Sequence, residues 1–176
     1  VLSGCVHGSI DCLRLLAENG VSMIGRCGIY SVTPLDAACF GNQLETVRFL
    51  LDQKSDPNSG NFYGFTALHE AAKWSRPEIV TLLLEAGADV EARNSNNRSA
   101  LDELASISNS ARQFGETSYR DYAVSKRRLD VARLLVDAGL DPSGSGDGNA
   151  SPLELAKRAG DTELAEVLSS DSTDTQ

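Results

Sequence analysis

The stretch Gly64–Val90, GFTALHEAAKWSRPEIVTLLLEAGADV, predicts two short helices joined by a tight turn. The first helix follows Thr66 and carries small and apolar residues on one side at helical spacing: Ala67, Leu68, Ala71 and Ala72. Pro77 interrupts it, because proline lacks an N–H and suits the first turn of a new helix. The second helix is rich in Ile, Val and Leu and ends at Gly87, which predicts a left-handed cap. Two such helices cannot bury their apolar faces alone, so a neighbour must stack on each side.

The chain repeats this unit. An acidic residue recurs at the start of each second helix: Asp11, Glu45, Glu78, Asp130 and Glu163. The intervals are 34, 33, 52 and 33 residues, and 52 equals 33 plus an insertion of 19. A short signature recurs with them: TPLDAAC from Thr33, TALHEAA from Thr66, SALDELA from Ser99 and SPLELAK from Ser151. A period near 33 with a T-P-L-H-x-A pattern is typical of ankyrin repeats, and the chain from Val1 to about Leu168 resembles that family.

The resemblance implies an all-α solenoid of stacked helix–turn–helix units with short β-turn fingers. We expect one ankyrin-repeat domain over residues 1–168 and a disordered polar tail over 169–176. The expected repeats are about 1–27, 28–60, 61–93, 94–145 and 146–168. Because the chain starts inside a first helix, we expect the first repeat to be truncated and the sequence to be a piece of a longer protein.

The fourth repeat carries the insertion, at about residues 109–127 between its two helices. The segment Ser118–Asp121 resembles a capping box, although Asp replaces the preferred Glu or Gln. Two interpretations stay open. One is a helical hairpin extension that stands out from the end opposite the fingers, and the other is a solvated loop tolerated at a turn.

Charge and hydropathy limit the kinds of partner that we expect the chain to bind. The formal net charge of −9, from 16 Lys+Arg and 25 Asp+Glu, argues against nucleic acid and anionic membrane surfaces. No window approaches the roughly 18 apolar residues of a membrane-spanning helix, and no secretory leader is recognisable. We therefore expect a protein or peptide partner, with no nucleic acid and no membrane.

The four cysteines fit no zinc-ligand spacing. Cys5 and Cys39 fall at small-residue positions of first helices, and Cys12 falls at an apolar position of a second helix. We expect these three to be packed, reduced thiols, whereas Cys27 lies in a loop where it can be exposed. Free thiols favour a cytoplasmic or nuclear location.

Catalytic machinery is not apparent. The resemblance implies that His69, the signature histidine of its repeat, ties the neighbouring loop by hydrogen bonds. Other repeats place Asp36, Asp102 and Glu154 there, where a carboxylate can accept hydrogen bonds from backbone N–H groups. Stacked repeats lie roughly 10 Å apart, so these positions do not form a contiguous acid–base ladder. The sequence shows no nucleophile elbow, metal triad or Cys–His pair, and we predict a protein that is not an enzyme and uses no metal or cofactor.

The aromatic residues indicate a binding surface. Six of them do not occupy the repeated core positions: Tyr30, Phe40, Phe62, Tyr63, Phe65 and Trp74. They fall at finger tips or first-helix ends, and the resemblance implies that such positions line the concave face and vary with the partner. With Glu70, Lys73 and Arg98 at its polar margin, we expect one exposed apolar surface over repeats two and three. Packing of finger against finger is the alternative for some of the rings, whereas Phe49 is expected in the core.

These patterns predict a protein–protein interaction module that holds a protein or peptide on this aromatic face. The alternatives are an enzyme or small-ligand binder that uses the same groove, and a structural spacer within a larger protein. None of the patterns specifies the partner or the oligomeric state.

Overall fold

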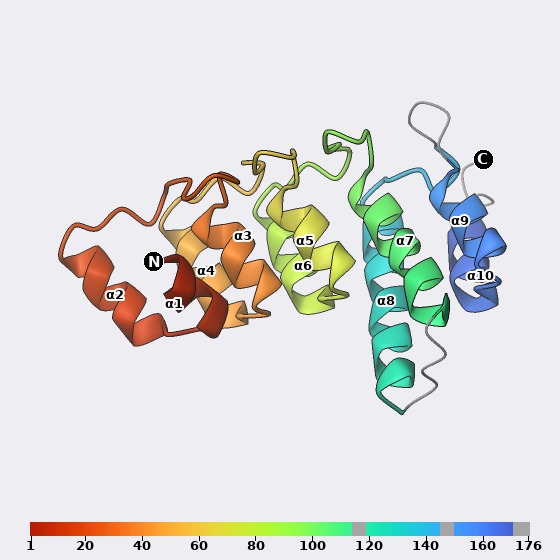
Figure 1. Cartoon of the computed structure of the whole chain (residues 1–176), viewed down its shortest axis with the longest axis horizontal. Coiled ribbons are helices and arrows are strands. Elements are labelled where there is room, and N and C mark those ends of the chain that lie inside the picture. Colours follow the sequence, from red (N-terminus) through yellow and green to blue (C-terminus); the bar gives the residue numbers. More distant parts are fainter. Residues whose placement is uncertain (114–118, 145–149, 171–176) are drawn as a thin grey trace.

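The computed structural model describes residues 1–113, 119–144 and 150–170; of these, 107–113, 119–125 and 170 are described by their backbone alone. Ten helices form in the described ranges: α1 (Leu2–His7), α2 (Ile10–Glu18), α3 (Pro34–Phe40), α4 (Leu44–Asp52), α5 (Ala67–Lys73), α6 (Pro77–Glu85), α7 (Ala100–Gln113), α8 (Tyr119–Asp137), α9 (Pro152–Arg158) and α10 (Thr162–Ser170). They stand as five consecutive pairs in a row (Figure 1). The row confirms the all-α ankyrin solenoid predicted from the period.

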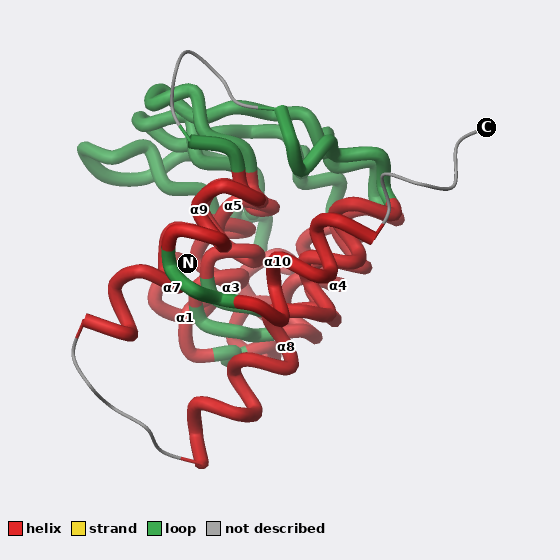
Figure 2. The backbone as a smooth tube through the Cα atoms, turned by 90° about the vertical axis from the view of Figure 1, so that its right-hand side faces the viewer, coloured by secondary structure: helices red, strands yellow, loops and turns green. Residues whose placement is uncertain are grey.

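The pairs stack in two layers. The first helices α1, α3, α5, α7 and α9 contact one another in order, and α4, α6, α8 and α10 do the same behind them. The long connections between pairs gather along one side of the molecule, away from the short turns within pairs (Figure 2). The Cys27–Val32 bridge is the isolated antiparallel pairing found in the described loops. Each layer buries the apolar stripe of its neighbour, so the core is continuous along the row.

The first helices α3, α5, α7 and α9 begin at side-chain caps. The N–H of Thr33 donates to Asp36 Oδ2 at 2.9 Å, and the N–H of Ser99 donates to Asp102 Oδ2 at 2.8 Å. Ser151 repeats the pattern, with its N–H 3.2 Å from Glu154 Oε2. The acidic residues at the signature histidine position therefore accept backbone hydrogen bonds, as the sequence predicts.

Left-handed residues end the first helices. Gly8, with a φ of 68°, directly follows α1, and Asn42 (56°) and Ser75 (53°) are the second residues after α3 and α5. Asn tolerates this conformation better than most residues, which explains its place at the turn after α3. Pro77 begins α6, and Gly87, with φ 85°, follows its end, so both predicted boundaries of that helix are confirmed.

The fourth pair is longer than the others. α7 has 14 residues and α8 has 19, whereas α5 has 7 and α6 has 9. Both extend past the neighbouring pairs at the end opposite the long connections (Figure 1). The backbone of the expected insertion thus continues α7 and begins α8, and its residues 114–118 lie outside the described ranges, as does the expected tail from residue 171 on.

One cysteine prediction is wrong. Cys12 is exposed, not packed, although Cys5 and Cys39 are buried and Cys27 is exposed as expected. The equivalent positions of the next two repeats, Thr46 and Ile79, are each 1% exposed, because a preceding helix pair covers them. Among the described helices, no pair stacks on the outer side of α2, so the same position faces solvent there.

Phe49 is in the core only in part. Its ring packs against the buried cluster but is partly exposed, and the guanidinium of Arg14 lies 5.7 Å from the ring centroid. The fully buried side chains of α4 are Val47 and Leu50.

Candidate functional site

Three of the predicted rings gather on the loops. Tyr30 and Tyr63 stack with centroids 6.0 Å apart, and Phe62 meets Tyr63 edge-on at 5.4 Å. The two loops are joined by a hydrogen bond from the N–H of Phe62 to the carbonyl of Tyr30, 2.8 Å long. All three rings remain exposed, and Phe62 is 70% exposed. Adjacent loops thus hold their rings together without covering them.

Two further rings lie at the ends of first helices. Phe40 closes α3 and Trp74 follows α5, and their rings meet edge to face with centroids 5.4 Å apart. The indole Nε1 donates to Glu70 Oε2 at 3.2 Å, which fixes the ring over the last turn of α5. Both rings are more than two-fifths exposed. We call these five exposed rings the ring face: Tyr30, Phe40, Phe62, Tyr63 and Trp74.

Phe65 and Lys73 lie beside the helix-end ring of Trp74. Phe65 is partly buried, with its ring 5.6 Å from that of His69. The Nζ of Lys73 lies 5.5 Å from the Phe65 centroid and 5.9 Å from that of Trp74, within cation–π range of both rings. The exposed rings therefore form two contact groups, and Lys73 links Phe65 to the helix-end group.

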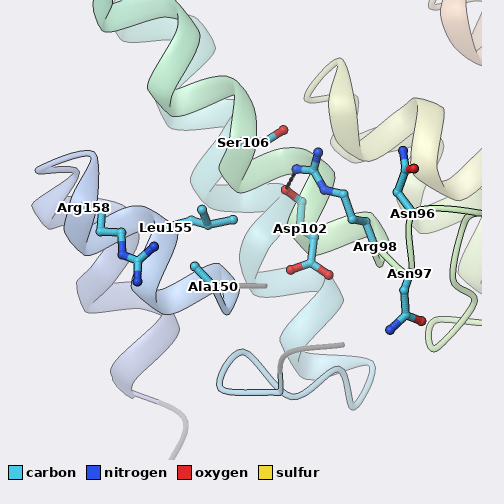
Figure 3. A pocket seen from close by; sticks show the side chains of 8 residues that line it. All are labelled: Asn96, Asn97, Arg98, Asp102, Ser106, Ala150, Leu155 and Arg158. Carbon is cyan, nitrogen blue, oxygen red and sulfur yellow. Dashed lines mark hydrogen bonds between the residues drawn. The ribbon is translucent and has the colours of Figure 1, made fainter. Parts of the chain in front are cut away.

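Arg98 faces a different hollow. Its Nε lies 3.4 Å from Glu103 Oε1, and its Nη2 donates to the carbonyl of Asp102 at 2.9 Å. Its side chain lines a cavity of about 620 Å³ between α7 and α9, with Leu155 and Arg158 on the other side (Figure 3). Its guanidinium group is held one repeat along from the rings.

Both ring nitrogens of His69 are engaged in hydrogen bonds to the backbone. Its Nδ1 accepts the N–H of Thr66 at 3.2 Å, so its Nε2 carries the proton and donates to the carbonyl of Arg98 at 3.0 Å. Burial lowers the pKa of the imidazole, which keeps the ring neutral. The histidine thus ties its helix to the next loop, as expected, and neither nitrogen is left for proton transfer. The described residues contain no cluster of three or more potential metal ligands.

A smaller cavity beside Phe40 was not foreseen from the sequence. It has a volume of about 250 Å³ and lies on the inner side of α1 and α3. Its apolar walls are Leu2, Val6, Val32, Ala37 and Phe40. Asp36 and Glu70 supply two carboxyl groups to the same cavity, which we call the acidic slot. The signal in the sequence was Asp36 itself, an ionisable residue at the position where the next repeat has His69.

The surroundings of both carboxyl groups shift their pKa values. Burial raises the pKa of Asp36 from 3.8 to about 6, against the hydrogen bonds from Thr33 that lower it, and repulsion by Glu70 raises it further. Burial also raises the pKa of Glu70, while the charge of Lys73 lowers it. Desolvation dominates in both cases, because each carboxyl lies among apolar side chains.

Five stacked helix pairs with a period near 33 residues define a helical repeat array. A family model for three copies of the ankyrin repeat matches residues 5–94. The chain belongs to the ankyrin-repeat family.

Individual relatives cover different parts of the chain. Human transient receptor potential cation channel subfamily A member 1 is 24% identical over 164 residues, which are 92% of this chain and 13% of the channel protein. Bovine ankyrin repeat and SOCS box protein 5 is 47% identical over 64 residues, 36% of this chain and 19% of that protein. Human ankyrin repeat and SOCS box protein 11 is 33% identical over 110 residues, 61% of this chain and 32% of that protein. The chain thus spans a third or less of these relatives.

Membership of the family sets the class of function. Ankyrin repeats generally mediate protein–protein interactions and are generally not catalytic. None of the described helices is both long and apolar enough to cross a membrane.

Proposed function

We propose that the chain holds a protein or peptide partner on the ring face, which spans repeats two and three. The observation that carries the proposal is the exposure of five large rings on adjacent repeats, from 42% at Trp74 to 70% at Phe62. Clusters of exposed large apolar side chains mark interaction sites, and Trp and Tyr are enriched among the residues that contribute most to binding.

Burial of the exposed rings against a partner is energetically favourable. Leaving a large apolar side chain in water instead of burying it forgoes roughly 1.5–3 kcal/mol per side chain. The rings hold one another through edge and stacking contacts, so little ordering remains to be done on binding. The loop rings and the helix-end rings would contact different parts of an extended partner, with Lys73 beside the helix-end rings.

We further propose that this binding takes place in the cytoplasm or nucleus. The four cysteines are unpaired, and two of them, Cys12 and Cys27, are exposed thiols that an oxidising compartment would modify. A disulfide in the protein isolated from cells would contradict this location.

The test compares Phe62→Ala and Trp74→Ala with Leu15→Ala. Leu15 is 61% exposed on α2, outside the ring face, and so controls for the loss of an exposed apolar side chain. Partners are captured on the immobilised chain and identified by mass spectrometry, and their affinities are then measured by calorimetry. We expect each ring variant to weaken binding by at least about 1 kcal/mol and Leu15→Ala to leave it unchanged.

Stability separates binding from folding. The two ring variants should each change the free energy of unfolding by less than about 0.5 kcal/mol, as exposed substitutions usually do. Leu50→Ala, at a side chain with no exposure, should cost about 2–5 kcal/mol and serves as the core reference. If Leu15→Ala abolishes capture while the ring variants retain it, the partner binds elsewhere on the array.

A further inference from the structure

We propose that the acidic slot takes a basic side chain, lysine or arginine, of the protein or peptide that binds the ring face. The inference rests on the proposed function, because the slot and the ring face share Phe40 and one bound chain would contact both. It names the chemistry by which that partner is recognised.

The first argument is an oxygen without a donor. Asp36 is 3% exposed, and its Oδ2 accepts the N–H of Thr33. Its Oδ1 is also buried but has no hydrogen-bond partner among the described residues. A buried polar atom without a partner is costly, and most such atoms in folded proteins are satisfied. An ammonium or guanidinium group that enters the slot supplies the donor that the fold itself does not.

The equivalent position of the next repeat shows the contrast. His69 is as deeply buried as Asp36, but each of its ring nitrogens has a partner, in Thr66 and in the carbonyl of Arg98. An ionised carboxylate cannot donate as the Nε2 of His69 does. Asp36 therefore closes its own helix cap with one oxygen, and the other stays buried without a partner on a residue that lines the slot.

The second argument is charge. Glu70 brings a second carboxyl group to the slot, and the two raise each other's negative potential instead of cancelling it. The cations that act on them lie outside the slot lining: Lys73, over the Phe65 and Trp74 rings, and Arg26, whose guanidinium donates to Ser59 in an exposed bond. The slot thus has a negative potential on a chain whose formal net charge is −9.

The third argument is shape. The slot has a volume of about 250 Å³, several times the roughly 30 Å³ that one water occupies in the liquid. Its walls are aliphatic except for the ring of Phe40, the amide of Asn61 and the two carboxyl groups. Lysine and arginine combine an apolar stem with a charged head, so the stem packs on the walls while the head reaches the carboxylates. An acidic side chain would be repelled, and an aliphatic one would leave Asp36 Oδ1 without a donor.

The experiment selects random linear peptides that bind the full chain by display, and then changes one side chain at a time. In a selected peptide, replacing the enriched lysine by norleucine, or the enriched arginine by citrulline, removes the charge and keeps the stem. We expect this change to weaken binding at least about tenfold, as truncation of a buried charge pair does. On the Glu70→Gln and Asp36→Asn variants the same peptide change should have an effect below about twofold, because the partner charges are gone.

The outcomes separate this inference from the proposed function. Peptides whose binding requires Phe62 and Trp74 but shows no preference for a basic residue would overturn the inference and leave the proposed function in place. Peptides that keep their basic-residue preference unchanged on both slot variants would overturn it too, since the charge is then recognised elsewhere. If no peptide is selected, nuclear magnetic resonance titration with Nα-acetyl-lysine methylamide decides. Perturbed methyl signals of Leu2, Val6 and Val32, absent with the norleucine analogue, support the slot, and unperturbed signals reject it.

Discussion

At the scale of single residues, Asp36 shows how a buried charge links stability to pH. Its native pKa of about 6 lies above the ordinary 3.8, so between these values the folded chain binds the proton more tightly than the unfolded chain does. The free energy of unfolding therefore falls as the pH rises from about 4 to about 6, and the cost is fully present above that range. A carboxylate stabilised by a salt bridge has the opposite pH dependence, because folding lowers its pKa.

The Asp36→Asn variant tests this linkage. The amide oxygen still accepts the N–H of Thr33, but no charge is buried, so we expect a more stable chain at pH 7.5. The difference between 3.8 and about 6 corresponds to at most about 3 kcal/mol. Urea unfolding at pH 7.5 and pH 4.5 measures it, and the gain should largely disappear at the lower pH. Glu154→Gln, at the equivalent but exposed cap, is the control. A gain of the same size at both pH values would show that the charge of Asp36 is not its cause.

The cysteines make a second residue-scale prediction. Burial raises the pKa of Cys5 to about 11 and raises that of Cys39 strongly, so neither thiol forms thiolate at neutral pH. Cys12 and Cys27 are exposed. Titration with a thiol reagent at pH 8 should modify two cysteines in the native chain and four after denaturation. Peptide mapping should place the two native adducts on Cys12 and Cys27, and early labelling of Cys39 would contradict the packing of α3.

At the scale of elements, the contact of α1 with α3 depends on a glycine. Gly41 has an ordinary φ of −72°, so it is not needed for a left-handed turn. A Cβ built at this position would lie 2.1 Å from the carbonyl oxygen of Val6. The amide of Gln43 donates to that same carbonyl at 3.1 Å, so the backbone of α1 is held close to the end of α3.

Gly41→Ala should therefore destabilise the chain. We expect a loss of about 1–3 kcal/mol, the usual cost of overpacking, because backbone atoms and not a flexible side chain meet the new methyl group. Gly25→Ala is the matched control, since a Cβ at Gly25 meets nothing within 4 Å. Denaturant unfolding of both variants gives the comparison, and equal stabilities would mean that α1 moves away freely.

The sequence predicts where helices begin and end better than it predicts which surfaces neighbouring helices cover. The turn at Asn42, the start of α6 at Pro77 and its end before Gly87 were all predictable, because local backbone chemistry determines them. The exposure of Cys12 was not, since it depends on whether another helix pair covers α2. The acidic slot was missed for the same reason: it forms where α1, α3 and α5 approach one another, and no single repeat contains it.

At the scale of the whole molecule, the repeats explain why the candidate rings were predictable but their grouping was not. Large rings outside the repeated core positions are not explained by the stacking of helices. Tyr30, Phe62 and Trp74 stood out in the sequence for this reason. The distances between their ring centroids depend on how neighbouring repeats are placed relative to one another. Because each repeat contacts only its neighbours, changes outside the shared faces are tolerated by the array as a whole.

The long fourth pair allows a direct test of that tolerance. Deleting residues 109–127 shortens the separation of Leu101 and Asp130 from 29 to 10 residues, the separation of Leu68 and Glu78 in the regular third repeat. The described core side chains of this pair lie outside the deleted segment: Leu101, Leu104, Ala105, Val131, Ala132 and Leu135. The ion pair of Arg128 with Asp161, which ties α8 to the last pair, is also kept.

We expect the shortened chain to fold as one array, with a single cooperative transition by circular dichroism and in urea, because every described stacking face is retained. Its transition midpoint should stay close to that of the full chain. Leu135→Ala in the full chain provides the scale, with an expected loss of about 2–5 kcal/mol for a core leucine. A deletion that costs as much as Leu135→Ala, or that splits the transition in two, would mean that the long ends of α7 and α8 stabilise the array. The insertion would then belong to the core and not to an appendage of the solenoid.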